Sequence, residues 1–215
     1  MNQVGEVNPV IVAVVWAAVG AAGGWLVRWG SVRLAKLEEL EPGHKPWQVW
    51  GPIIGCAIVF AAFGYELGVS WLLLLHSIFG LVLVQVIFFD LEHRLILDRV
   101  IFPSMALALV VSLFNQPWWY GLATGVAAGL LFLLVAILGA LVFKTEALGF
   151  GDVKFAAFMG LLLGPLPTVQ ALFYGVFLAG LAAIGVIIWN RSLKGTIAYG
   201  PYLALAALIV LFQMR

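Results

Sequence analysis

The sequence predicts an all-α fold, a polytopic membrane helix bundle of about eight transmembrane helices. Hydrophobic residues make up 64% of the 215 positions and charged residues only 10%, and the mean hydropathy is +1.12. This composition lies far outside the usual balance of a soluble domain. The apolar residues form runs of about membrane length and do not alternate like barrel strands. Because backbone groups in lipid must bond within their own segment, helices are the expected structure.

Eight apolar runs can be counted, and each is interpreted as one membrane-spanning helix. A hydrocarbon core of about 30 Å takes about 20 helical residues, or fewer where the bilayer is thinned. The run after Asp152 offers only about 18 Å of helix before Pro165 and Pro167 interrupt it, so we expect Asp152 to be drawn below the membrane surface, or the bilayer to thin around it. The runs cover approximately residues 9–27, 51–67, 71–89, 100–114, 119–143, 153–163, 168–189 and 196–212.

The chain is predicted to form a single integral membrane domain over residues 1–215, because no strongly charged half or long polar linker divides it. A short cytoplasmic loop is expected at 28–50, where leucines alternate with charged residues and favour a short helix lying at the membrane interface. The amino end, MNQVGEVNPV, lacks the basic stretch of a cleavable signal peptide. The first apolar run is therefore expected to stay in the mature protein.

The distribution of basic residues predicts how the chain is oriented. When the eight runs are threaded alternately through the membrane, nearly all lysines and arginines fall on one side, which should be cytoplasmic. We therefore expect a multi-pass protein of the cytoplasmic (inner) membrane with both termini outside, and Asp90 and Asp152 both at the cytoplasmic boundary. The terminal Arg215 is left on the other side. The cytoplasmic set comprises Arg28, Arg33, Lys36, Lys45, Arg94, Arg99, Lys144, Lys154, Arg191 and Lys194.

Composition also argues against several classes of function. The net charge of +1 argues against nucleic acid as a partner, because phosphate binding needs a concentrated basic face. The single cysteine, Cys56, lies in an apolar stretch and is interpreted as a small core residue. It can form neither an internal disulfide nor a thiolate cage for zinc. The three histidines are scattered and do not indicate a metal site.

Two acidic residues lie where a membrane protein seldom carries charge. Asp90 ends the apolar run LVLVQVIFFD, and Asp152 lies inside ALGFGDVKFAAF, directly ahead of another apolar run. A carboxylate at the border of hydrocarbon is costly, so each needs a reason. Two carboxylates held close together cannot both ionise easily and titrate as a unit. Such a pair can hydrolyse a peptide, since one group takes a proton from water while the other hydrogen-bonds the scissile carbonyl.

The surroundings of Asp152 suit that role. Gly149 and Gly151 remove side chains on either side of Phe150, which allows the backbone to approach a substrate or a neighbouring helix closely. A helix that starts here would also direct free N–H groups at the site.

Structural explanations of the same charges stay open. Asp90 could pair with Arg94 one turn later, and Asp152 could cap the next helix or pair with Lys144 or Lys154. Lys154 could instead bias the carboxylate pair toward ionisation, or anchor its helix at the membrane surface.

Other polar residues and glycines receive structural interpretations. Asp98 directly precedes an apolar run and is expected to be a helix N-cap, with a supporting role at the site as the second possibility. His76 is expected to form a hydrogen bond inside the bundle, and Gln85 to bond between helices. Glu92 and His93 are expected to be solvated in a loop after Asp90. A stripe of small residues should let another helix approach closely, and it comprises Gly121, Gly125 and Gly129.

At this point the sequence resembles the type IV prepilin peptidases, which are membrane-embedded aspartyl proteases with a GxGD motif. FFDLEHRLILD resembles the first motif of that family, in which an aspartate at the cytoplasmic end of a helix is followed eight residues later by another, here Asp90 and Asp98. GFGDVK, residues 149–154, matches the GxGD motif, so the resemblance implies Asp152 as the second catalytic residue. YGPYLA, residues 199–204, looks like the late Gly-Pro segment, with Gly200 and Pro201 in place. The resemblance runs from about Gln85 to Leu205.

The sequence departs from the family pattern in two places. Family members usually have proline before the second aspartate of the first motif, where this chain has Leu97. Bifunctional members carry a cytoplasmic insert with two cysteine pairs after the first helix, associated with N-methylation of the trimmed pilin, whereas residues 28–50 contain no cysteine. The resemblance therefore implies peptidase activity without the methyl transfer.

The sequence thus predicts an aspartyl endopeptidase that cleaves prepilin or pseudopilin-like membrane proteins at the cytoplasmic face of the bilayer. Asp90 and Asp152 would be catalytic, and the reaction needs no cofactor or metal. Two alternatives stay open. One is a presenilin-like intramembrane protease, although its Pro-Ala-Leu segment is absent. The other is a transporter or ion-coupled permease whose buried carboxylates bind cations.

Overall fold

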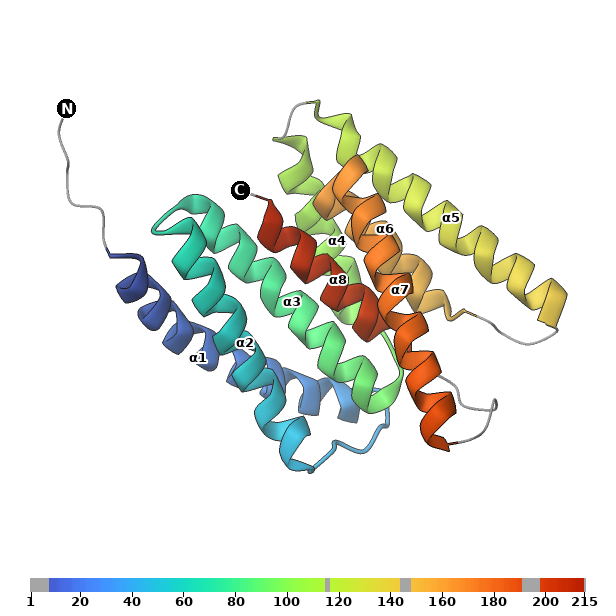
Figure 1. The fold of residues 1–215 in the computed structure, drawn as a ribbon, viewed down its shortest axis with the longest axis horizontal. Coiled ribbons are helices and arrows are strands. Elements are labelled where there is room, and N and C mark those ends of the chain that lie inside the picture. Colours follow the sequence, from blue (N-terminus) through green and yellow to red (C-terminus); the bar gives the residue numbers. More distant parts are fainter. Residues whose placement is uncertain (1–7, 115–116, 144–147, 191–197, 215) are drawn as a thin grey trace. The chain divides into compact units, whose positions relative to one another are not determined.

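The computed structural model describes residues 8–114, 117–143, 148–190 and 198–214. Over these residues the chain forms helices and no strands, which confirms the predicted all-α fold. In chain order the described helices (Figure 1) are α1 (Pro9–Leu37), α2 (Pro46–Leu67), α3 (Trp71–His93), α4 (Asp98–Leu113), α5 (Trp119–Phe143), α6 (Phe150–Leu163), α7 (Pro165–Asn190) and α8 (Gly200–Gln213).

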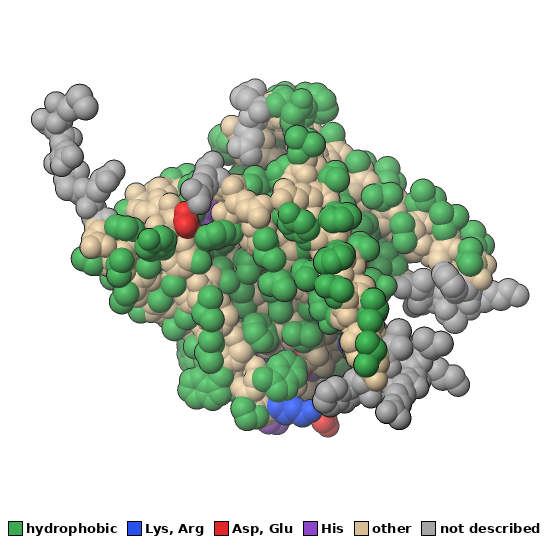
Figure 2. Space-filling view, in the orientation of Figure 1, with side chains coloured by type: hydrophobic (Ala, Val, Ile, Leu, Met, Phe, Trp, Pro, Cys, Tyr) green, Lys and Arg blue, Asp and Glu red, His purple; other side chains and the backbone are tan. Residues whose placement is uncertain are grey.

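Five of the described helices are long and apolar enough to cross a membrane. These are α1, α2, α3, the Trp119–Val142 part of α5 and the Pro165–Val186 part of α7. Helices α4, α6 and α8 have 16, 14 and 14 residues, so each is roughly 21–24 Å long. Figure 2 shows hydrophobic side chains over most of the visible face. The chain is a multi-pass helical membrane protein.

The contacts of the chain divide it into two compact units. The first runs to His93 and also takes in the end of the chain from Phe212, and the second comprises Arg94–Leu211. Each unit is described separately below. That residues 1–215 form a single domain stays a prediction.

In the first unit, α1 and α2 pack through small residues. A Cβ atom on Gly20 would lie 2.5 Å from the carbonyl oxygen of Cys56, and one on Gly24 would lie 2.5 Å from that of Pro52. Only glycine permits this backbone approach. The Cys56 side chain is fully buried there, so it is a core residue, as predicted.

Buried polar side chains of α3 are satisfied within the first unit. Gln85 Nε2 donates to Ser31 Oγ on α1 over 2.9 Å, which confirms the predicted bond between helices. The two ring nitrogens of His76 lie 3.0 Å from the Leu72 carbonyl oxygen and 3.1 Å from that of Met214. His76 is buried, in agreement with the hydrogen-bonding role expected of it.

The connection between α1 and α2 is shorter than predicted. The expected loop at 28–50 is reduced to residues 38–45, because α1 continues unbroken to Leu37 and α2 begins at Pro46. The expected short interfacial helix is therefore the last part of α1. Proline suits the first position of α2, since an N–H there would have no partner within the helix.

In the second unit, α5 and α6 approach through glycine, as the Gly121, Gly125 and Gly129 stripe predicted. A Cβ on Gly125 would lie 2.8 Å from Leu161 Cγ, and one on Gly160 would lie only 2.6 Å from Gly125 Cα. The short helix α6 also packs against α4 and α7. These contacts determine where α6 lies in its unit.

The boundaries of the later helices differ from the expected ones. Helix α6 stops at Gly164, whose φ of 74° favours glycine, and α7 starts at once with Pro165 instead of at 168. A first-turn proline costs no helical hydrogen bond. Helix α8 starts at Gly200 instead of at 196, and residues 191–197 lie outside the described residues. Leu203 of α8 packs against Gly175 of α7.

Several residues on which the orientation depends lie outside the described residues. They are the first seven of the chain, Lys144, Arg191, Lys194 and Arg215. The orientation of the termini therefore stays a prediction.

The α5–α6 contact gives a test of packing. Gly160→Ala should lower the free energy of unfolding by roughly 1 to 3 kcal/mol, because the added methyl group would collide with the backbone of α5. Gly180→Ala on α7 is the matched control, since nothing lies within 4 Å of its Cβ position, and it should be neutral or slightly stabilising. Thermal unfolding of both variants in detergent measures this. Equal midpoints would contradict the packing.

Candidate active site

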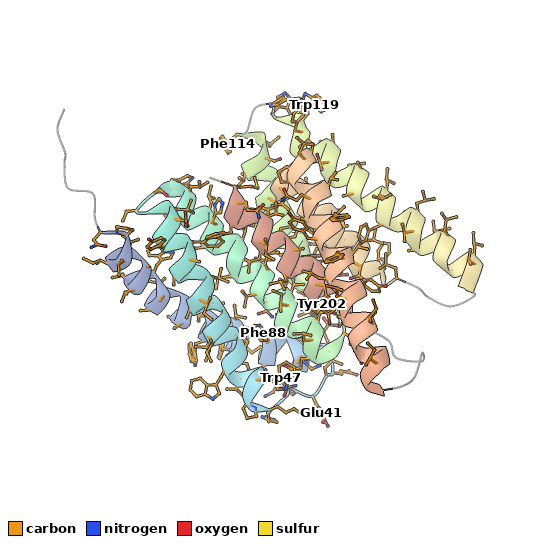
Figure 3. The ribbon with its side chains drawn as sticks, viewed as in Figure 1. Glu41, Trp47, Phe88, Phe114, Trp119 and Tyr202 are labelled. Atoms are coloured by element: carbon orange, nitrogen blue, oxygen red, sulfur yellow. The ribbon has the colours of Figure 1, made fainter. Side chains whose placement is uncertain are left out.

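Asp90 lies in the last turn of α3 and its side chain is buried, at 4% exposed. Phe88, two residues earlier, packs its ring against Gly51 and Gly55 of α2. A Cβ atom added to Gly55 would lie only 3.1 Å from this ring. In Figure 3, Phe88 lies with Glu41 and Trp47 toward the end of this unit where α3 finishes. The polypeptide around Asp90 is therefore well packed.

The expectation that Glu92 and His93 are solvated in a loop is wrong. Helix α3 continues to His93, and the Glu92 side chain is only 6% exposed. Its Oε2 lies 3.3 Å from Arg28 Nη1, and its Oε1 lies 3.3 Å from His93 Nε2. The sequence signal for this pairing was Arg28, a charge directly after an apolar run, which needs a partner when it is buried.

Exposed tryptophans mark the same end of the first unit. Such aromatic belts are typical of the boundary between membrane and water. Arg28 lies between two of them on α1, and the others lie in the first turns of α2. They are Trp25, Trp29, Trp47 and Trp50.

Asp152 is the third residue of α6, after the N-cap Gly149. Its N–H donates to the Gly149 carbonyl over 3.1 Å, and its side chain hydrogen-bonds the Gly149 backbone. This is the position at which an acidic side chain completes a helix cap. Asp152 therefore takes part in capping α6, as one of the structural alternatives predicted. This capping is compatible with a catalytic role.

The electrostatic surroundings of Asp152 favour its neutral form. It lies outside the five helices that are long and apolar enough to cross a membrane. Burial raises the pKa of its carboxyl to about 6, while the hydrogen bond with the Gly149 backbone lowers it in part. Near neutral pH the group can therefore exist in both protonation states, as an acid–base residue requires.

Gly151 brings the start of α6 against the segment that precedes α4. A Cβ on Gly151 would lie 3.1 Å from Ile96 Cβ, so a side chain here would push the two segments apart. Ile96 and Asp98 belong to the FFDLEHRLILD motif, and Gly151 belongs to GFGDVK. The second unit thus joins part of one motif to the other.

An ion pair fixes the same junction. Lys154 Nζ lies 2.6 and 2.7 Å from the two Asp98 carboxylate oxygens and 4.9 Å from the centre of the Phe150 ring. The expected N-cap role of Asp98 is wrong, because Leu97 is the N-cap and Asp98 is the first helical residue of α4. The acidic partner that the structure gives Lys154 is thus Asp98.

Gly200 and Pro201, the late motif residues, are both buried at the start of α8. Asp90 belongs to the first unit, whereas Asp152 and the other motif residues belong to the second. The convergence of Asp90 and Asp152 therefore stays a prediction. Over the described residues, no three His, Cys, Asp or Glu side chains are grouped as a metal site.

Comparisons with known proteins agree with the motifs. A model of the type IV leader peptidase family matches residues 77–188, which contain Asp90, Asp98 and GFGDVK. The chain is 29% identical to a prepilin leader peptidase/N-methyltransferase of Bacillus subtilis (strain 168), over 71% of this chain and 61% of that protein. It is 30% identical to one of Xanthomonas campestris pv. campestris, over 87% of this chain and 64% of that protein.

The chain thus spans less than two-thirds of the length of these curated relatives. No solved structure matches it significantly.

The raised pKa of Asp152 predicts a pH-dependent cost to stability. Because the folded protein holds this proton to about pH 6 and the unfolded chain only to about pH 4, stability should fall as pH rises through that window. Asp152→Asn cannot ionise. It should therefore be more stable than the unchanged protein by roughly 1 to 2 kcal/mol at pH 7.5, a figure reduced for partial exposure.

The difference should vanish below about pH 4, where the carboxyl is neutral in both states. Thermal unfolding in detergent between pH 4 and 8 measures it. A difference that does not change with pH would contradict the burial of this carboxyl.

Proposed function

The chain belongs to the type IV leader peptidase family, and we propose on this basis that it is a membrane-embedded aspartyl endopeptidase. It removes the leader from prepilin-like substrates at the cytoplasmic face of the membrane. The observation that carries this proposal is Asp152, a partly buried carboxyl within GFGDVK whose pKa is raised to about 6. Such a perturbed group in a family motif is the expected property of a catalytic acid or base.

In the proposed mechanism Asp90 and Asp152 share one proton. The ionised carboxylate takes a proton from water, the water oxygen attacks the scissile carbonyl carbon, and the protonated partner donates a hydrogen bond to the carbonyl oxygen. When the tetrahedral intermediate collapses, the C–N bond breaks and the leaving amine takes up the proton that the carboxylate had taken from water. Both groups must open onto one wet pocket near the inner leaflet, where they titrate as a pair.

Four features support the assignment of these two aspartates. Asp90 is buried at the end of a membrane-spanning helix, and exposed tryptophans typical of a membrane boundary lie at that end of its unit. Asp152 is positioned by close packing of α6 and by the neighbouring ion pair of Asp98 with Lys154. In this proposal Gly149, Gly151, Gly200 and Pro201 have supporting roles in shaping the site.

The proposed substrates are prepilin or pseudopilin-like membrane proteins, because the two curated relatives are named as prepilin leader peptidases. A substrate of this kind places a hydrophobic helix in the bilayer and its leader junction at the membrane surface. In the proposed orientation, the end of α3 lies at this surface. The bond to be cut would therefore lie at the depth of Asp90.

We propose that methyl transfer is not part of this activity. Both relatives also carry the name N-methyltransferase, but the connection between α1 and α2 is only residues 38–45. It holds no cysteine. The cysteine-bearing insert that the family resemblance associates with methylation is thus missing from this position.

Substitution of the two aspartates tests the peptidase. Asp90→Asn and Asp152→Asn should each reduce cleavage by about 10²- to 10⁴-fold, because an amide can neither accept nor supply the catalytic proton. Glu39→Gln, which changes an exposed carboxylate, is the matched control and should cleave normally. Purified proteins are incubated with a panel of prepilins, and the new amino termini are identified by mass spectrometry.

Full cleavage by either Asn variant would refute the aspartyl mechanism. A transporter or permease would cleave none of the substrates before substitution and would instead lose ion-coupled flux in the Asn variants. A presenilin-like protease would cleave within the hydrophobic helix, and the new termini would show it.

The methyl-transfer proposal has its own measurement. When S-adenosylmethionine is added to a reaction that cleaves prepilin, the new amino terminus should keep the mass of the unmodified residue. A mass increase of one methyl group would overturn the proposal.

A further inference from the structure

An ion pair lies buried two residues beyond Asp90. The side chains of Arg28 and Glu92 are 11% and 6% exposed, and their nearest charged atoms are 3.3 Å apart. Glu92 lies in the last turn of α3, where the carbonyl ends of the helix already carry partial negative charge. A carboxylate is therefore unfavourable there unless a cation compensates it.

The loop between α1 and α2 completes the arrangement. The Gly43 N–H donates to Glu92 Oε1, and Arg28 Nη2 donates to the Gly43 carbonyl oxygen. With the Arg28–Glu92 bond, each of the three groups bonds to the other two. We call this closed set the Gly43 clamp, and it consists of Arg28, Gly43 and Glu92.

The clamp joins segments that the chain keeps far apart. It ties α1, residues 38–45 and the last turn of α3 within the first unit. His93 strengthens the same turn, because its Nε2 lies 3.3 Å from Glu92 Oε1 and its ring lies 4.7 Å from that of Phe89. Removing either charge would leave the other buried without its partner, which is strongly unfavourable.

We infer that Arg28 and Glu92 are positioning residues for Asp90. By holding the last turn of α3 against the 38–45 connection, the clamp fixes the direction in which the Asp90 carboxyl leaves its helix. This inference rests on the proposed function. Because a small displacement of a reacting group costs much of the rate, loosening the clamp should slow the chemical step more than it weakens substrate binding.

Two variants separate charge from shape. Glu92→Gln keeps an oxygen that can accept from the Gly43 N–H but loses the charge that Arg28 balances. Arg28→Lys keeps the cation but has only one amino group, so it cannot repeat the planar fork that reaches both Glu92 and Gly43. Arg33→Gln is the control, since Arg33 is exposed on the same helix and stacks on Trp29 at 3.9 Å.

Two measurements are made on the purified protein. Glu92→Gln should lower kcat for prepilin cleavage at least about tenfold with KM changed less than about threefold. Hydrogen exchange of the amides at 40–45 and 90–93 should speed up at least about tenfold, because the clamp no longer closes. Arg28→Lys should show smaller changes in the same direction. The double variant that combines Arg28→Gln and Glu92→Gln should cleave prepilin no more slowly than the slower of the two corresponding single variants.

The outcomes distinguish this inference from the function on which it rests. If the unchanged protein cleaves, Asp152→Asn does not, and both clamp variants keep their kcat, the positioning inference fails while the peptidase stands. The positioning inference fails in that case even if hydrogen exchange of the amides at 40–45 speeds up. If the unchanged protein cleaves nothing, the proposed function fails and the inference fails with it. Loss of kcat in Arg33→Gln to the same extent would also overturn the inference.

Discussion

A charge or an open peptide group beside hydrocarbon has to be compensated by the protein itself, and the structure follows from this constraint. It makes the described chain helical, since helices satisfy their own backbone. It also explains why polar side chains of α3 have partners on α1: Gln85 bonds Ser31 and Glu92 pairs with Arg28. Buried pairs of this kind add little to stability by themselves, but breaking one is costly. They therefore specify which helix faces meet.

The same constraint acts differently on Asp152. Close packing of Gly151 against Ile96 brings the start of α6 against the segment before α4, and the Asp152 carboxyl there is largely buried. The Gly149 backbone offsets only part of the resulting penalty, so the pKa stays raised. Between about pH 4 and 6, the carboxyl in the GxGD motif thus holds a proton that an exposed aspartate would lose. The close approach at Gly151, the residue before Asp152, and the chemistry proposed for Asp152 thus belong to the same turn of α6.

Much of the fold could be predicted from local patterns. Apolar runs located the helices, because hydropathy and helical period are properties of neighbouring residues. Glycines four residues apart indicated the α5 face that contacts α6. The predictions were wrong where one local pattern was compatible with two different structures. Leucines among charges after Arg28 suited an interfacial helix, but the same residues extend α1. Asp98 suited an N-cap, but it lies one position further into the helix and bonds Lys154 there.

The sequence by itself determined the membrane class, the order of the helices and the family motifs, because these depend on composition and on short spacings. Only the tertiary structure decided the partners of the charged residues. Arg28, Gly43 and Glu92 meet because the connection at residues 38–45 contacts both α1 and the last turn of α3. These contacts join residues 15, 49 and 64 positions apart, and no local pattern specifies which ends of which helices will be adjacent.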